Sequence, residues 1–284
     1  MVLRTNHLLA AVFAATLLLQ PALASAQPAG LSSAEPTFAD IADMADSAGM
    51  VLLVRVAKQI AVKDERAPGL QPGHRRFYME AETRSLLTGG APIGGSVKYL
   101  VDLPLDDRGK APKLKKQDVF LFARPVPGRP GEVQLVTPTS QRPWTAAGEE
   151  RLRSILRQLV SPNAPAKITG VRELLYVPGN LQGQGETQIF LATKDGSAAS
   201  ISVRHEPGAP PAWGVSFSEL VANVGNPPRK ETLEWYRLAC FLPSRPPAAA
   251  NISASYGESR QAEADYRMVL GELGPCERNL AGTR

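Results

Sequence analysis

The sequence has little cysteine and little histidine. Its 284 residues include two cysteines, Cys240 and Cys276, and three histidines. A structural zinc site needs about four such ligands at short spacing, which this composition does not supply. Neither cysteine stands beside a histidine that could act as its base, which disfavours a cysteine nucleophile. We therefore expect no metal and no cofactor.

The chain also lacks a strong excess of either charge. It has 32 Lys and Arg against 27 Asp and Glu, a formal net charge of +5. A dedicated nucleic-acid-binding domain usually shows a larger basic excess, so we expect no nucleic acid as partner. Hydrophobic residues make up 43%, enough for a core, and the 25 prolines and 24 glycines fall mostly between apolar runs. This pattern favours short strands and many turns over a helical bundle.

Long apolar runs are absent except near the N-terminus, where one covers residues 8–19. That run is shorter than the roughly 20 residues needed to span a bilayer. Arg4 precedes it, and the tripeptide Ala-Ser-Ala at 24–26 matches a signal-peptidase site. The sequence therefore predicts a signal peptide over residues 1–26, cleaved between Ala26 and Gln27. It also predicts a periplasmic or secreted protein without a transmembrane segment after cleavage.

Export bears directly on the two cysteines, because an even number in an oxidising compartment favours a disulfide. Cys240 falls near the end of a predicted helix over residues 231–242, and Cys276 lies just past a second over 263–273. In an antiparallel helix hairpin these two ends would stand about 20 Å apart, yet the proline-rich segment between them can run back. We predict a Cys240–Cys276 bond, with two separate buried thiols as the alternative.

The N-terminal half reads as β-rich. Residues 27–36 form a disordered lead-in, and a short helix capped by Thr37 follows, with Asp43 and Asp46 on its polar face. About ninety residues then hold five alternating apolar segments separated by turns. A small antiparallel barrel fits this pattern, and its strand number is that of an OB-type barrel. We assign residues 37–144 to this barrel-like domain.

The periodicity changes near residue 145. An amphipathic helix is predicted over residues 145–160, followed by four strand-like segments and two closing helices. The tripeptide Lys-Asp-Gly at 194–196 predicts a hairpin turn between two of these strands. We assign residues 145–284 to a second domain and the whole chain to the α+β class, with antiparallel strands and two C-terminal helices in this half.

No linear motif for catalysis is convincing. Ser216 lies in Gly-Val-Ser-Phe-Ser, which lacks the second glycine of a nucleophile elbow. Residues 178–186 are rich in glycine but lead into a strand, whereas a phosphate cradle needs a helix N-terminus. His74 and His205 each stand at a predicted strand edge, and no pattern brings them together. We therefore lean away from an enzyme, and an exported hydrolase with a non-linear active site is the alternative.

One segment concentrates positive charge without an acidic residue, and its cations are Arg108, Lys110, Lys113, Lys115 and Lys116. Such a loop can bind an anionic partner. The alternative is a solvated loop whose lysines discourage edge-to-edge strand pairing. We predict a non-enzymatic binding or envelope-associated protein, with an anionic envelope polymer or another periplasmic protein as partner.

Several segments together resemble a group of exported proteins of sphingomonad-type bacteria. They are spread over most of the mature chain and read KLKKQDVFLFARPVPGRPGEVQLV, GNLQGQGETQIFL, WGVSFSEL and LEWYRLACFLP. The resemblance implies export and a two-part layout. It transfers no catalytic residue.

Overall fold

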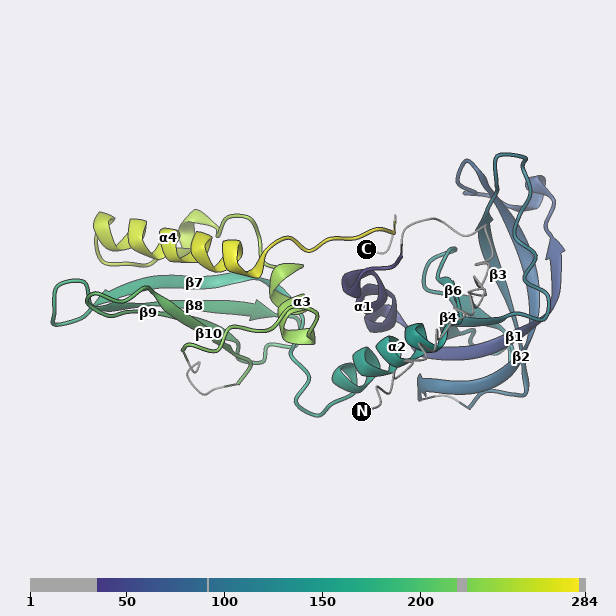
Figure 1. The fold of residues 1–284 in the computed structure, drawn as a ribbon, viewed down its shortest axis with the longest axis horizontal. Coiled ribbons are helices and arrows are strands. Elements are labelled where there is room, and N and C mark those ends of the chain that lie inside the picture. Colours follow the sequence, from purple (N-terminus) through teal and green to yellow (C-terminus); the bar gives the residue numbers. More distant parts are fainter. Residues whose placement is uncertain (1–34, 91, 219–223, 281–284) are drawn as a thin grey trace, which may run out of the picture.

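The structure is a computed structural model that describes residues 35–90, 92–218 and 224–280. The predicted signal peptide, its cleavage site at Ala26 and Gln27, and most of the lead-in over residues 27–36 lie outside this part. The described chain is α+β, with antiparallel sheets and four α-helices. Figure 1 shows a curled sheet at one end, a helix-covered sheet at the other, and helices between them.

The first sheet is six-stranded and antiparallel, with the path β3-β2-β1-β4-β5 and with β6 paired to β4. Its strands are β1 (Met50–Ala61), β2 (His74–Gly89), β3 (Ser96–Pro104), β4 (Asp118–Pro125), β5 (Val133–Leu135) and β6 (Gln141–Pro143). The register between β1 and β2 shifts at three places. Such irregularities bend and twist a strand pair, which lets this sheet curl around its own core.

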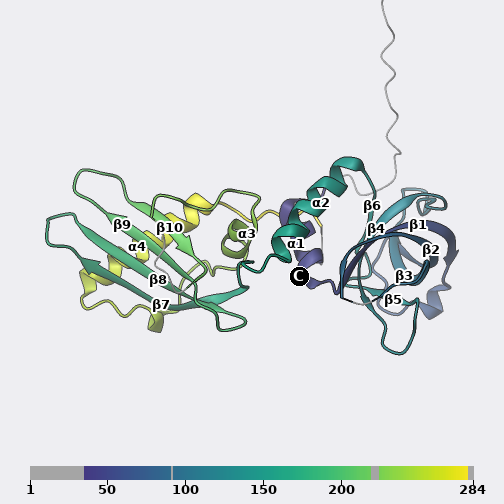
Figure 2. The ribbon, with the colours of Figure 1, turned by 90° about the horizontal axis from the view of Figure 1, so that it is seen from below.

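Side-chain alternation builds that core. Met50 and Leu52 of β1 point inward, into a buried cluster that the curled sheet encloses. Val51, between them, points outward and packs in the cluster of the helices. Figure 2 shows the curl.

The two edges of the curled sheet approach each other without forming a ladder. The N–H of Lys98 in β3 donates to the carbonyl of Gly131 at 2.8 Å, and that of Asp102 donates to Pro138 at 2.8 Å. A single parallel bridge joins Lys98 to Glu132. No closed barrel is found among the described strands.

The second sheet has the order β10-β9-β8-β7 and is antiparallel throughout. Its strands are β7 (Ile168–Pro178), β8 (Gly185–Thr193), β9 (Ser200–His205) and β10 (Ala212–Ser216), and α4 (Tyr256–Leu273) covers one face (Figure 1). All four strands were predicted. The predicted hairpin turn is also present, with Gly196 at a φ of 78°. The helix α4 begins earlier than predicted, because Ser255 and Glu258 form a capping box.

Three further helices lie between the sheets: α1 (Phe38–Ser47), α2 (Ala146–Leu159) and α3 (Leu233–Ala239) (Figures 1 and 2). Thr37 caps α1, as predicted. Phe38 of α1 packs edge-on against Trp235 and Tyr236 of α3, with ring centroids 6.3 and 6.4 Å away. One hydrophobic cluster joins these helices to the second sheet and to the outer face of the first. Within the described chain, no helix combines the length and apolar character needed to cross a membrane.

Candidate functional site

The predicted basic segment forms the loop that joins β3 to β4. Its five cationic side chains, Arg108, Lys110, Lys113, Lys115 and Lys116, are all exposed. The loop has its own support, because Asp106 accepts the backbone N–H groups of Arg108 and Lys110 at 3.0 and 2.8 Å. Leu114 is 2% exposed and packs in the core of the curled sheet. The loop therefore presents its charges to solvent from an anchored backbone.

An exposed apolar row crosses the outer face of the first sheet. Ile60 pairs with Tyr78, and Tyr78 pairs with Leu100, so the three side chains lie on one face of three adjacent strands. Ile60 and Leu100 are each 50% exposed. Exposed apolar side chains that are contiguous mark an interaction site more strongly than scattered ones. We call these three residues the apolar row.

A charged row runs beside the apolar row on the same face. Glu80 pairs with Lys58 on one side and with Lys98 on the other. The Lys58 ammonium lies 2.8 Å from the Glu80 carboxylate, and this contact lowers the pKa of Glu80. The row holds two cations and one carboxylate, which leaves one positive charge in excess.

A groove of about 500 Å³ adjoins both rows, between β3 and the segment that connects β4 to β5. Tyr78 and Leu100 of the apolar row line one side of the groove. Val126, in the segment that connects β4 to β5, and Val136, directly after β5, also line it. Its charged lining residues are Arg76, Lys98, Asp102, Arg129 and Glu132. The groove thus combines an apolar surface with three cations and two carboxylates.

Two ion pairs fix charged side chains in the groove. Arg76 binds Asp102 through two hydrogen bonds of 2.6 and 2.8 Å, and this contact raises the pKa of Arg76. Arg129 lies 3.3 Å from Glu132 and is largely exposed. Since exposed pairs contribute little free energy, Arg129 can exchange Glu132 for an anionic ligand at small cost.

The basic loop begins at the end of β3 that carries the Arg76–Asp102 pair of the groove. His74 pairs with Pro104 at the end of β3, two residues from the paired Arg76 and Asp102. The basic loop follows Pro104 directly. The loop then runs to β1, where Lys116 donates its N–H to the carbonyl of Val56 at 2.7 Å, and its five cations are not among the residues that line the groove.

A larger hollow of about 550 Å³ lies beside α2 and includes Trp144. Its polar groups bind one another: Glu149 accepts from the Trp144 indole at 2.7 Å and from the Arg153 guanidinium at 2.8 Å. The hollow is lined by two carboxylates and two guanidinium groups and so has no excess of cations, whereas the groove has one cation in excess.

The two histidines of the described residues, His74 and His205, lie on different sheets. His74 begins β2, and its Nδ1 lies 3.1 Å from the carbonyl of Pro72. His205 ends β9 and donates through Nε2 to Asp265 of α4 at 2.9 Å. Asp265 is 3% exposed and also accepts a hydrogen bond from the Thr187 hydroxyl. In a hydrolytic triad the hydroxyl would contact the histidine, whereas here both groups bind the carboxylate, so the cluster ties α4 to its sheet.

The other catalytic candidates have structural roles in the described chain. Ser216 is the last residue of β10, and its hydroxyl lies 3.0 Å from that of Ser218. Residues 178–186 form the hairpin connection between β7 and β8 together with its flanking strand ends. Among the described residues, no group of three or more His, Cys, Asp or Glu is placed to hold a metal ion.

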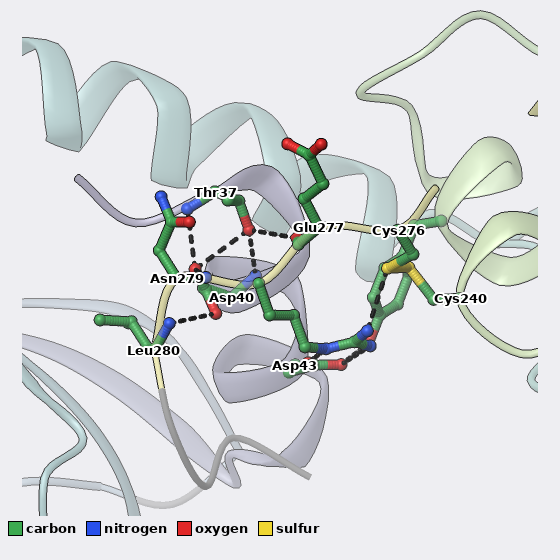
Figure 3. Close-up of polar contacts among 10 residues, drawn as sticks. Thr37, Asp40, Asp43, Cys240, Cys276, Glu277, Asn279 and Leu280 are labelled. Atoms are coloured by element: carbon green, nitrogen blue, oxygen red, sulfur yellow. Dashed lines mark hydrogen bonds and ion pairs between the residues drawn. A yellow bond between two sulfur atoms is a disulfide. The ribbon is translucent and has the colours of Figure 1, made fainter. Parts of the chain in front are cut away.

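The predicted Cys240–Cys276 bond is present, with the Cα atoms 5.1 Å apart (Figure 3). Cys240 follows α3 directly and is 6% exposed. The helix α4 is also held by contacts other than this bond. Trp235 donates to the carbonyl of Leu273 at 2.8 Å, and the bonds of Asp265 fix the middle of α4. The disulfide instead anchors the segment beyond α4.

That segment, residues 276–280, is called the C-terminal strap. It crosses α1, as Figure 3 shows for Glu277, Asn279 and Leu280. Thr37 donates to the carbonyl of Glu277 at 2.9 Å, and Asn279 donates its backbone N–H to Asp40 at 2.9 Å. Asp43, which the sequence places on the polar face of α1, is covered by the strap together with Asp40: Asp40 is 0% and Asp43 5% exposed.

Comparison with known proteins places the chain in no family. No protein-family model matches it. No curated protein is significantly similar to it. Its function is therefore argued from the groove, the two rows and the loop.

Proposed function

We propose that the chain is an exported, non-enzymatic binding protein of the cell envelope, and that an extended anionic polymer binds along the groove. The apolar row carries this proposal, because the half-exposed Ile60 and Leu100 lie in register with the partly buried Tyr78, beside the cations of the groove. Sugar rings have apolar faces that pack against tyrosine and leucine. Their carboxylate or phosphate substituents are attracted to the Lys and Arg side chains. Export is supported by the leader pattern and by the disulfide.

We further propose that the first sheet is a small, partly open barrel of the OB type. Its five main strands curl around one core, and its edge strands β3 and β5 meet at the Lys98–Glu132 bridge. OB barrels bind oligosaccharides and oligonucleotides on the face of their second and third strands and on the adjoining loops. The apolar row occupies the corresponding face here. This support is an analogy of fold and adds to the local chemistry without replacing it.

The apolar row is tested by Tyr78→Ala combined with Leu100→Asp. We expect the affinity for purified lipopolysaccharide to fall about tenfold or more, because each buried apolar side chain contributes about 1.5–3 kcal/mol. The measurement is titration calorimetry at fixed salt. Val160→Asp is the matched control, since Val160 is 64% exposed but lies outside the groove. Equal affinity of the double variant and the control would exclude the groove as the binding site.

The basic loop is tested by changing Lys113, Lys115 and Lys116 together to Gln. Retention on heparin and on immobilised lipopolysaccharide should weaken at low salt, and the difference should shrink as ionic strength rises. Salt-gradient elution measures both. Retention that matches the unmodified protein at low salt would identify the segment as a solvated loop.

A further inference from the structure

The C-terminal strap donates hydrogen bonds to two buried carboxylates of α1, the first helix of the described chain. Asp40 of α1 is 0% exposed, and its carboxylate accepts the backbone N–H groups of Asn279 and Leu280 at 2.9 and 3.2 Å (Figure 3). Asp43 is 5% exposed and accepts two hydrogen bonds from the Arg278 guanidinium, at 2.6 and 3.3 Å. A buried carboxylate that loses such partners is strongly destabilised. The position of α1 therefore depends on the strap.

The helix α1 in turn connects the two sheets. It directly precedes β1, which lies at the centre of the curled sheet. On its other side, Asp43 accepts from the Tyr236 hydroxyl at 2.5 Å, and Asp46 binds Arg237 at 2.8 and 3.0 Å. Both of these partners belong to α3, and Cys240 follows α3 directly. A change in the position of the strap therefore affects α1 and α3, through which the two sheets are connected.

We propose that the Cys240–Cys276 disulfide is a redox-controlled latch on α1. In the oxidised chain the bond fixes the start of the strap beside α3, so the four residues that follow stay on α1. Reduction frees the strap from α3, loosens α1, and weakens the connection between the curled sheet and the helix-covered sheet. The reductant is a dithiol, such as an exported protein with two neighbouring reactive cysteines.

The order of attack in the thiol–disulfide exchange follows from the different exposure of the two cysteine residues. Cys276 is half-buried and Cys240 is buried, so a thiolate of the dithiol attacks Sγ of Cys276. The disulfide breaks, and Cys240 leaves as a thiolate and takes a proton. The second thiol of the reductant attacks the mixed disulfide and frees Cys276. Two electrons pass to the cysteine pair, and the reductant ends as a disulfide.

Arg278 assists the second step from within the strap. Its Nη1 lies 3.1 Å from Sγ of Cys276. A guanidinium at this distance stabilises the thiolate that leaves when the mixed disulfide is resolved. The same side chain binds Asp43, so the sulfur chemistry and the hold on α1 share one residue.

The test is hydrogen–deuterium exchange of the whole chain, oxidised and after treatment with dithiothreitol under native conditions. We expect the bond to be reduced without denaturant, as counted by thiol labelling. Amides of residues 37–47 and 276–280 should then exchange about tenfold faster or more through local opening, while amides of β8 and β9 still exchange only through global unfolding. The variant Arg278→Gln, with its disulfide intact, should loosen residues 37–47 to a smaller degree.

Three results would overturn the latch. If the disulfide were reduced only in denaturant, a dithiol could not reach it in the folded protein, and it could not act as a latch. Unchanged exchange of residues 37–47 after reduction would show that the strap holds without the bond. Equal loss of protection in all helices and strands would show that the bond stabilises the fold as a whole and controls no particular element.

Discussion

Replacing Cys240 and Cys276 together with serine is expected to lower the free energy of unfolding by about 4 kcal/mol. The bond spans a sequence separation of 36 residues, and in the chain-entropy account a closed loop of this length restricts the unfolded chain by that amount. The melting temperature should fall by about 10 °C for a protein of this size. Thermal unfolding followed by circular dichroism measures the change.

Reduced protein of unchanged sequence is the control, because it has lost the bond but not the sulfur atoms. It should melt close to the double variant. We expect α4 to stay docked in both, since the Asp265 and Trp235 contacts hold it independently of the bond. A loss below about 1 kcal/mol would contradict the prediction and would show that the strap is held by its hydrogen bonds alone.

The variant Asp46→Ala is expected to lower the free energy of unfolding by about 3 kcal/mol or more. Asp46 forms two hydrogen bonds with Arg237, whose side chain is 4% exposed. Removing the carboxylate leaves this guanidinium buried beside a single carbonyl, that of Pro165. Breaking a buried pair at one partner is much more costly than breaking an exposed one. Urea unfolding at neutral pH measures the loss.

The same carboxylate gives an expected pH dependence. Burial raises the pKa of Asp46, but the hydrogen bonds and charges of Arg237 and Lys167 outweigh it, and the net pKa is lowered. A lowered folded-state pKa contributes stability that is complete above the ordinary aspartate range and is lost as pH falls through the folded value. Asp46→Ala should therefore flatten the acid limb of the stability curve.

Arg153→Ala supplies the matched control for Asp46→Ala. Arg153 pairs with Glu149 on the surface of α2, where their side chains are 49% and 23% exposed. Removing the Arg153 side chain should lower the free energy of unfolding by about 0.5 kcal/mol or less. If the two variants were equally stable, the Asp46–Arg237 pair would contribute no more than an exposed one.

Elements with a strong local pattern could be predicted from the sequence. The strand β8 alternates buried and half-buried residues along its length, and α2 has its apolar residues at helical spacing. The strand β6 was missed because its three residues, Gln141–Pro143, have no apolar alternation and form a strand only by pairing with β4. The burial of Asp40 and Asp43 was missed because the strap that covers them lies more than 230 residues away in sequence.

The residues of the candidate site also fall into two groups, those that could be predicted from the sequence and those that could not. The basic loop is a cluster within one segment, so its residues could be named from the sequence. The apolar row is formed by single residues of three strands, and only the register brings them together. A signal was present in β3, where Leu100 is an apolar residue between Lys98 and Asp102 on the polar side of the alternation. One such residue is ordinary on a protein surface, whereas three in register are the basis for the proposed binding surface.

The contact between α1 and the strap also has a consequence for the order of folding. A chain that is synthesised from its N-terminus presents residues 37–47 long before residues 276–280. Until the last residues arrive, Asp40 lacks the backbone N–H groups of Asn279 and Leu280. Local contacts within each sheet close over short sequence separations and form early, whereas this one must bring the chain ends together. The first helix of the described chain is thus the element whose native contacts are completed last.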